Sequence, residues 1–187
     1  PGTTTRYQNL YPEMRIVFNP EFLTERAANL DFINASRIVL GGNSEDVEKV
    51  AELYRDRFPY TKIITTDAES AEFIKYMCNC FFATKISFMN EMYLMSEKMG
   101  GNWLKIMEGF ISDGRIGNSH IEVPGHDGDL GFGGKCFPKD INAFIGYFES
   151  SGVDPIILKS AWERNKTVRS DKDWSKIKGA VSSNDKE

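Results

Sequence analysis

The N-terminal part of the chain alternates short apolar runs with polar segments. Residues 15–22 and 37–42 are rich in β-branched side chains and predict strands, and so do residues 62–66. Apolar residues recur on one side of 44–58, which predicts an amphipathic helix between the last two strands. Strand, helix and strand at this spacing indicate part of a parallel α/β layer.

A long apolar helix is predicted from about Asp67 to Met99. Thr66 and Glu69 have the spacing of a capping box at its start, and a glycine pair follows its end. Apolar side chains cover most sides of this segment. We therefore expect other helices or a partner subunit to cover it.

Shorter helices are predicted at about 102–110, 138–150 and 155–169, the last two with a proline at the first position. Asp154 stands where it could cap the third of them. The glycine-rich segment 111–137 is predicted to be a long loop. Loops of this length inside a compact domain are usually functional or disordered.

Composition narrows the class of protein. The chain has 187 residues, of which 41% are hydrophobic and 27% charged, a balance typical of a globular protein with a core. A net charge of −4 gives no support for a nucleic-acid partner. Because there is no apolar run of about 18 residues and no signal-peptide pattern, we expect no membrane span.

The cysteines and histidines give no support for a disulfide framework or for a metal site. The three cysteines, Cys78, Cys80 and Cys136, cannot all pair and include no CxxC, so we expect a reducing, cytoplasmic setting. The two histidines, His120 and His126, have no ligand-like neighbours at metal spacing, and we expect no metal site.

The segment 131-GFGGKCFPKD-140 is the strongest candidate for chemistry. Cys136 precedes a predicted helix start and lies between Lys135 and Lys139; helix N-termini and cations both favour a reactive thiolate. The glycines allow the backbone to approach a ligand, and Asp140 follows one helical turn later. The alternative is an ordinary buried thiol.

Three other segments carry candidate side chains. Lys75 and Asn79 are four residues apart on one face of the long helix, where a polar group needs a partner or a ligand. Glu21 and Glu25 follow a predicted strand and would share a face if that segment were helical. Arg115, in a glycine-bounded turn, could clamp a carboxylate or phosphate. For each of them a solvated surface position is the alternative.

Together these segments resemble the nucleotide-sugar dehydrogenases and, within that family, the UDP-glucose 6-dehydrogenases. The resemblance is carried, in the family's order across roughly residues 1–168, by NPEFLTERAA, AEFIKYMCNCFFATKISFMNE, DGRIG and GFGGKCFPKD. One such segment alone would be weak, whereas four in order are specific.

The resemblance implies an α/β plus all-α fold. Residues 1–66 would form the C-terminal part of a Rossmann-like NAD-binding domain. Residues 67–169 would form an all-helical central domain, whose long helix also makes a homodimer core, and residues 170–187 a polar tail that Trp174 would anchor. The family's G-x-G-x-x-G fingerprint is not in this sequence. We therefore expect a fragment, or part of a shortened member, that binds NAD poorly by itself.

The resemblance also implies a reaction: two hydride transfers from a nucleotide sugar to NAD, which convert the C6 alcohol of UDP-glucose to the acid of UDP-glucuronate. Cys136 would be the nucleophile, forming first a thiohemiacetal and then a thioester. Lys75 would stabilise the oxyanion, and Asp140 would handle protons and the hydrolytic water. Asn79 would support the same oxyanion and hold the sugar.

Further roles follow from the same resemblance. Glu21 would transfer a proton during thioester hydrolysis, and Glu25 would lie near the cofactor. Arg115 would reach the substrate, in the family often across the dimer interface. The residues that would line the substrate site are Phe22, Leu23 and Gly133.

Two alternatives stay open. A sister enzyme acting on GDP-mannose or an N-acetylated UDP-sugar is one; the FPKD sequence after Cys136 favours the UDP-glucose branch, whereas the long loop between Gly117 and Gly131 and the lysine at 135 depart from its usual pattern. The other is a non-catalytic dimerising helical module, left after loss of the nucleotide-binding domains.

Overall fold

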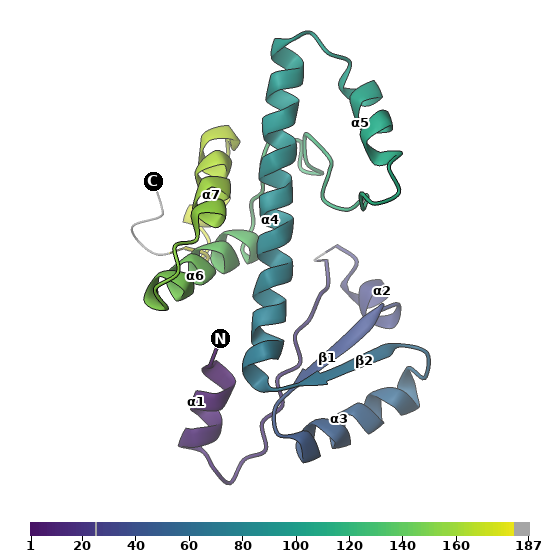
Figure 1. Cartoon of the computed structure of the whole chain (residues 1–187), viewed down its shortest axis with the longest axis vertical. Helices are drawn as coiled ribbons and strands as arrows, with labels where there is room; N and C mark the ends of the chain where they lie inside the picture. The colour runs from purple at the N-terminus through teal and green to yellow at the C-terminus, as the bar shows by residue number, and fades with distance from the viewer. Residues whose placement is uncertain (25, 182–187) are drawn as a thin grey trace. The chain divides into compact units, whose positions relative to one another are not determined.

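A computed structural model describes residues 1–24 and 26–181 of the chain (Figure 1). The chain divides into two compact units, Pro1–Met77 and Cys78–Glu187, and each is described by itself. The elements, in chain order, are α1 (Thr3–Leu10), α2 (Ala28–Ile33), β1 (Arg37–Gly41), α3 (Ser44–Arg57), β2 (Lys62–Thr66), α4 (Ala68–Lys98), α5 (Trp103–Ile111), α6 (Cys136–Ser150), α7 (Ile156–Val168) and the 3₁₀ helix η1 (Asp173–Ser175).

The first unit is built on a parallel β–α–β arrangement, as the sequence predicts. Strands β1 and β2 pair in parallel, with Arg37 opposite Lys62 and Gly41 opposite Thr66. Helix α3 connects them and lies along the sheet in Figure 1. Its apolar side contributes to a small core whose buried members are Ile38, Leu40, Val47 and Ala51.

The strand predicted at 15–22 is wrong. Only Phe18 pairs with the sheet, through two antiparallel hydrogen bonds of 2.8 Å with the backbone of Gly41. Beyond it, Asn19 donates its side-chain amide to the carbonyl of Val39 at 2.8 Å. Pro20 has no N–H to donate, so a regular ladder cannot continue along this segment.

Helix α1 is capped by a carboxylate from far along the chain. Glu72, in α4, is 4% exposed. It accepts hydrogen bonds from the N–H groups of Gly2 (2.5 Å), Thr3 (3.2 Å) and Thr4 (2.7 Å), and from the Thr4 hydroxyl (2.6 Å). Burial alone would raise the pKa of Glu72, but these hydrogen bonds outweigh it and leave the pKa lowered. The carboxylate therefore satisfies N–H groups that have no partner within α1.

The start of α4 also differs from the prediction. Asp67, rather than Thr66, caps the helix: its carboxylate accepts the backbone N–H and the hydroxyl of Ser70, both at 2.7 Å. Thr66 is the last residue of β2 and pairs with Gly41. Glu69 accepts instead from the Thr5 hydroxyl at 2.5 Å. The capping box is therefore wrong, although α4 covers almost the whole predicted helix.

In the second unit, α5, α6 and α7 lie close to their predicted positions. Helix α6 begins two residues before Pro138, which makes Cys136 its first residue. Asp154 does not cap α7; its carboxylate pairs with Lys159 at 2.9 Å, and no side-chain cap is formed. One core cluster of this unit consists of Met89, Ile121 and Val123.

The segment after α7 is packed rather than loose over its first residues. Trp174 is 0% exposed and lies against Trp162, with 5.1 Å between ring centroids. This confirms that Trp174 anchors the predicted tail. We call residues 169–176 the strap. Residues 182–187 of the predicted tail lie outside the described residues.

An apolar stripe on α4 is left uncovered. Four apolar side chains recur there at helical spacing and are exposed: Phe81 (62%), Phe88, Met92 and Met95.

In the part of the chain that the structure describes, none of the helices combines the length and the apolar character that a membrane span requires.

Replacing Glu72 with glutamine should destabilise the chain by about 1–3 kcal/mol at neutral pH, because buried N–H groups lose a charged acceptor. Since the folded pKa of Glu72 lies below its ordinary value of 4.5, this contribution is complete above pH 4.5. It is lost as the pH falls through the folded pKa. Urea unfolding of both chains at a series of pH values measures the gap, which should narrow in acid.

Glu69→Gln is the matched control, because Glu69 also bonds α1 but through an exposed contact with Thr5. Its effect at neutral pH should be smaller, because the contact that it loses is exposed. Equal losses for the two variants would contradict the capping role of Glu72.

Candidate active site

Cys136 is the exposed cysteine of the three. It is the first residue of α6 and therefore lies at a helix N-terminus. Cys80 is buried and hydrogen-bonds the carbonyl of Asp140, with sulfur and oxygen 3.7 Å apart. Burial, with a smaller effect of the Asp140 charge, raises the pKa of Cys80 to about 12. Cys136 is thus better placed than Cys80 to act as a nucleophile.

Asp140 and Asn79 meet in the second unit, as expected for residues of one site. Both are buried, and the Asn79 side-chain amide donates to Asp140 Oδ2 at 2.5 Å. The other carboxylate oxygen of Asp140 bonds the ammonium group of Lys139. Asp140 is one helical turn beyond Cys136 on α6. The carboxylate is therefore held by an amide and a cation beside the thiol-bearing turn.

Lys75, Glu21 and their neighbours meet in the first unit. The Lys75 ammonium donates to the backbone carbonyl of Glu21 at 2.5 Å and to its carboxylate at 2.8 Å. The same nitrogen lies 5.7 Å from the centre of the Phe22 ring, which also stacks under the Arg37 guanidinium at 4.1 Å. Leu23 donates its N–H to Glu21 Oε2 at 2.8 Å. A cation, a carboxylate and an aromatic ring are thus gathered around one turn of backbone.

The helix considered for Glu21 and Glu25 is not formed at Glu21. Residues 19–24 are irregular, and the next helix, α2, begins at Ala28. Pro20 disfavours helical backbone at Asn19, and the Glu21 carboxylate bonds the N–H of Leu23. Glu25 lies outside the described residues.

Arg115 is exposed in a turn after α5. Its guanidinium bonds the Asp113 carboxylate at 2.9 Å and 2.5 Å, and this bond raises the pKa of Arg115. Within the chain, the arginine is therefore engaged by a neighbour two residues away rather than by another predicted site residue.

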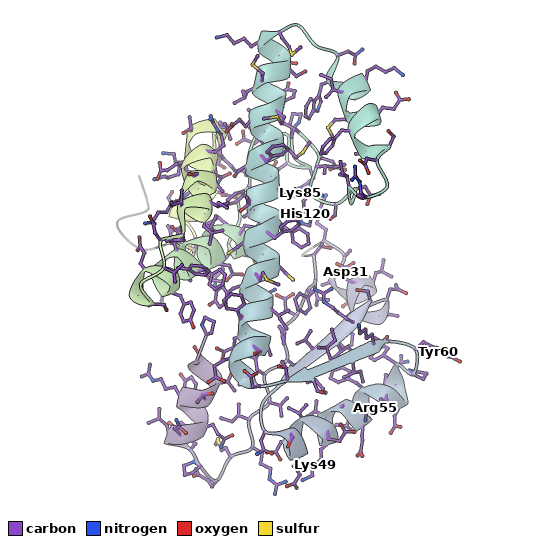
Figure 2. All side chains as sticks on the ribbon, viewed as in Figure 1. Asp31, Lys49, Arg55, Tyr60, Lys85 and His120 are labelled. Carbon is purple, nitrogen blue, oxygen red and sulfur yellow. The ribbon has the colours of Figure 1, made fainter. Side chains whose placement is uncertain are left out.

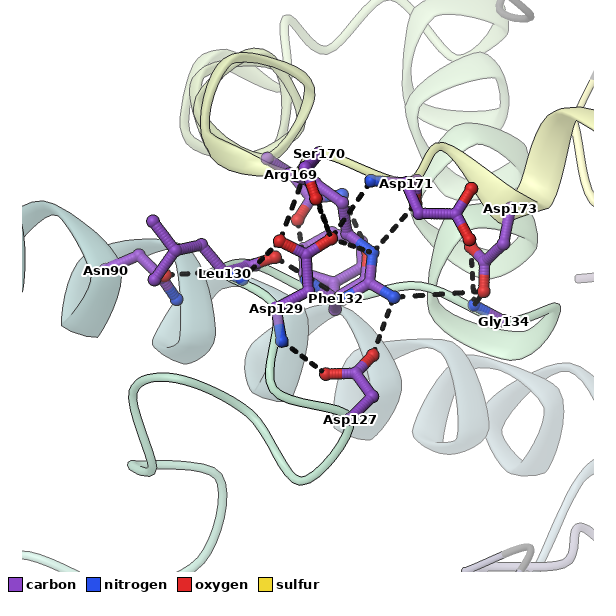
Figure 3. A network of polar contacts seen from close by, with 12 residues as sticks. Asn90, Asp127, Asp129, Leu130, Phe132, Gly134, Arg169, Ser170, Asp171 and Asp173 are labelled. Atoms are coloured by element: carbon purple, nitrogen blue, oxygen red, sulfur yellow. Dashed lines mark hydrogen bonds and ion pairs between the residues drawn. The ribbon is translucent and has the colours of Figure 1, made fainter.

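The segment 131–136, which we call the cysteine loop, is fixed by side chains that the sequence reading missed (Figure 3). Gly131 donates its N–H to Asn90 at 3.0 Å. Phe132 donates to Asn165 at 2.7 Å and accepts from it at 2.9 Å. A polar residue on an otherwise apolar helix face is the sequence signal that could have found these side chains. Asn90 and Asn165 are both buried.

Gly133 has a local structural explanation. A Cβ at this position would collide with the Arg169 guanidinium and the Asp173 carboxylate. At Gly131, where φ is +70°, a Cβ would collide with the amide of Asn165. These glycines therefore let the loop pack closely against the strap and α7.

The long loop ahead of the cysteine loop is held by Lys85 (Figure 2). Its ammonium donates to the carbonyls of Gly117 at 2.6 Å and Ser119 at 2.7 Å, and burial lowers its pKa. Next to it, His120 stacks on Phe82, with 4.1 Å between ring centroids. Burial first, and then the Lys85 charge, lower the pKa of His120 and favour the neutral ring. In the described part of the chain, no group of three or more histidine, cysteine, aspartate or glutamate side chains is placed so that it could hold a metal ion.

The strand-to-helix turn of the first unit does not fit a dinucleotide pyrophosphate. It leads from β1 through Gly42 to Asn43, whose side chain caps α3 by accepting the N–H of Glu45 at 3.0 Å. Glu45 and Asp46 occupy the first helical turn, where their charges would repel phosphate. The residues that would hold the phosphates of NAD are therefore not found at this turn.

Comparison with known proteins shows which family the chain resembles. Residues 69–167 match the model of the UDP-glucose/GDP-mannose dehydrogenase family, central domain. Residues 3–57 match the model of the same family's NAD binding domain, which indicates NAD as the cofactor.

Individual relatives agree. The chain is 40% identical over 151 residues to a UDP-glucose 6-dehydrogenase from Rickettsia conorii, covering 81% of this chain and 34% of the relative. It is 37% identical over 154 residues to the UDP-glucose 6-dehydrogenase TuaD from Bacillus subtilis, covering 82% and 32%. The chain thus spans about a third of the length of these curated relatives.

Among solved structures, a UDP-glucose dehydrogenase from the archaeon Pyrobaculum islandicum is similar, with a TM-score of 0.72 and 35% identity over 82% of this chain and 34% of the other. The central-domain match covers the cysteine loop, α6 and the greater part of α4 and α7. The chain therefore belongs to the UDP-glucose/GDP-mannose dehydrogenase family.

Proposed function

We propose that the protein to which this chain belongs oxidises the C6 alcohol of UDP-glucose to the carboxylate of UDP-glucuronate. The observation that carries the proposal is the exposed Cys136 at the start of α6, with the buried pair of Asp140 and Asn79 one turn away. NAD would supply the chemistry of the oxidation by accepting a hydride in each of two steps.

Cys136 is proposed as the nucleophile. Its thiolate attacks the C6 aldehyde produced by the first oxidation, and the new C–S bond gives a thiohemiacetal. Loss of a hydride from that carbon gives a thioester. Water then attacks the carbonyl, the C–S bond breaks, and the acid and the thiolate are released. A serine at this position would give an oxyester, a poorer intermediate for the last step.

Polar groups that accompany Cys136 in the family would handle charge and protons. We assign Lys75 to stabilisation of the oxyanion. It is a cation on the helix α4, and two hydrogen bonds to Glu21 hold its ammonium group in place. Asp140, fixed by Asn79, would accept a proton from the attacking water. Glu21 would take part in proton transfer during thioester hydrolysis.

The remaining assignments concern binding. Phe22, Leu23 and Gly133 are proposed to line the substrate site, and Arg115 to reach the substrate. The Arg115 side chain is exposed. Its guanidinium could therefore leave the Asp113 carboxylate and bind an anionic ligand without uncovering a buried charge.

Among nucleotide sugars, we propose UDP-glucose as the substrate. The curated relatives at 40% and 37% identity are named as UDP-glucose 6-dehydrogenases. A UDP-N-acetylmannosamine dehydrogenase from Pyrococcus horikoshii, at 24% identity and a TM-score of 0.73, shares the fold alone. The non-catalytic module is less favoured, because the candidate nucleophile is exposed and Asp140 is held beside it by Asn79 and Lys139.

We also propose that the protein forms a homodimer through α4. The support is the exposed stripe of Phe81, Phe88, Met92 and Met95, because an apolar stripe of this kind is commonly covered by another chain.

Cys136→Ser should lower the rate of UDP-glucuronate formation by about a thousandfold or more in the complete protein, because the thioester can no longer form. Chromatographic measurement of the acid, beside NADH absorbance, tests this. Cys78→Ser is the matched control and should retain most activity. Acid formation at the wild-type rate by Cys136→Ser would exclude the mechanism.

Phe81→Glu should weaken self-association at least tenfold, because it places a charge in the stripe that would otherwise be buried between subunits. Analytical ultracentrifugation over a concentration series measures the dissociation constant. Tyr60→Glu, at a fully exposed position off the stripe, is the control (Figure 2). If the two variants associate equally well, the interface lies elsewhere.

A further inference from the structure

Arg169 is a charged side chain with very little exposure. It is 5% exposed and sits among three carboxylates, those of Asp127, Asp129 and Asp173 (Figure 3). The nearest of them, Asp127, bonds it at 2.6 Å, whereas the other two lie 3.9 Å and 3.8 Å away. A guanidinium this deeply buried requires such partners, so the cluster holds the strap in place.

Asp129 joins the strap to the loop that leads to Cys136. It accepts the N–H groups of Ser170 (3.1 Å) and Asp171 (3.0 Å), and the hydroxyl of Ser170 (2.8 Å). Burial would raise the pKa of Asp129, but these hydrogen bonds lower it to about 2. The carboxylate therefore remains charged and bonded over the whole physiological range.

Asp173 makes the bond that reaches the cysteine loop itself. Its carboxylate accepts the N–H of Gly134 at 2.9 Å and 3.1 Å, two residues before Cys136. Gly134 has φ of +71°, and Gly133 packs directly against Arg169 and Asp173. The backbone that enters α6 is therefore fixed from the side of the strap.

The strap lies beyond the part of the chain that the family's central domain describes. That match ends at residue 167, whereas Arg169 and Asp173 follow it. No role for them follows from the motifs that carry the family resemblance.

We propose that Asp173, which lies 3.8 Å from Arg169, is a positioning residue that sets the orientation of the Cys136 turn for nucleophilic attack. The inference rests on the proposed role of Cys136 as the nucleophile. Asp173 acts through the Gly134 N–H and does not itself touch the substrate.

The hydrogen bond that Asp173 accepts from Gly134 can be tested separately from the interaction of Asp173 with the charge of Arg169. Both Asp173 oxygens are within hydrogen-bond distance of the Gly134 nitrogen, whereas the closest approach to Arg169 is a looser 3.8 Å. An asparagine can supply one acceptor oxygen without the charge. The neighbouring Trp174 keeps the strap anchored in either variant, because its side chain is fully buried.

The test compares three variants of the complete protein. Asp173→Ala should lower kcat for UDP-glucose oxidation about tenfold and leave KM within about twofold, because orientation rather than binding is lost. Asp173→Asn should recover most of kcat. Asp171→Ala is the matched control: Asp171 lies on the same strap, but its carboxylate pairs with the exposed Lys176 at 3.1 Å.

Hydrogen–deuterium exchange of a peptide spanning 131–136 gives a reading that does not depend on turnover. The Gly134 amide should exchange at least about tenfold faster in Asp173→Ala and near the wild-type rate in Asp173→Asn. Thermal unfolding of each variant checks that the fold is retained.

The outcomes are distinguishable. Equal kcat and exchange for Asp173→Ala and Asp171→Ala would overturn the proposal, as would an asparagine variant as impaired as the alanine one. A wild-type protein that oxidises no nucleotide sugar would refute the proposed function and, with it, the catalytic purpose of the positioning. Protected exchange at Gly134 would then still establish the contact.

Discussion

A polar side chain buried on a helix must find a partner, and this requirement organises the structure around α4. In the first unit, Glu72 bonds the start of α1 and Lys75 bonds the turn at Glu21. In the second, Asn79 bonds Asp140 on α6, and Asn90 bonds the cysteine loop. Within each unit, turns of α4 thus fix segments that are far apart in sequence. In the second unit, Asp140 and the cysteine loop are held to α4 in this way, because loops alone would not hold these groups.

Local patterns in the sequence predicted much of the fold. The β–α–β arrangement of the first unit and the four principal helices of the two units follow from hydrophobic periodicity, which acts over a few residues. Motifs within single segments also predicted Cys136, Asp140 and Asn79 as candidate site residues, and the structure brings the last two into hydrogen-bond contact.

What the sequence did not predict depends on long-range partners. Helix α1 has an unremarkable sequence and is capped by Glu72, which comes about seventy positions later. The strand predicted at 15–22 has suitable β-branched residues, but Pro20 ends its pairing. The strap looked like a polar tail because two of the three carboxylates around Arg169, those of Asp127 and Asp129, lie about forty residues earlier in the chain. For α1 and the strap, the decisive contact crosses between segments and leaves no local pattern, whereas Pro20 is a signal within its own segment.

The close packing of Gly133 against Arg169 has a consequence for sequence change in relatives. The guanidinium occupies the volume that a side chain at position 133 would need. The carboxylate of Asp173 occupies part of the same volume, so a larger residue at 133 requires a change at both 169 and 173. Position 133 should therefore vary together with these two strap positions during evolution, so that loss of the strap would free one glycine of the cysteine loop to diverge.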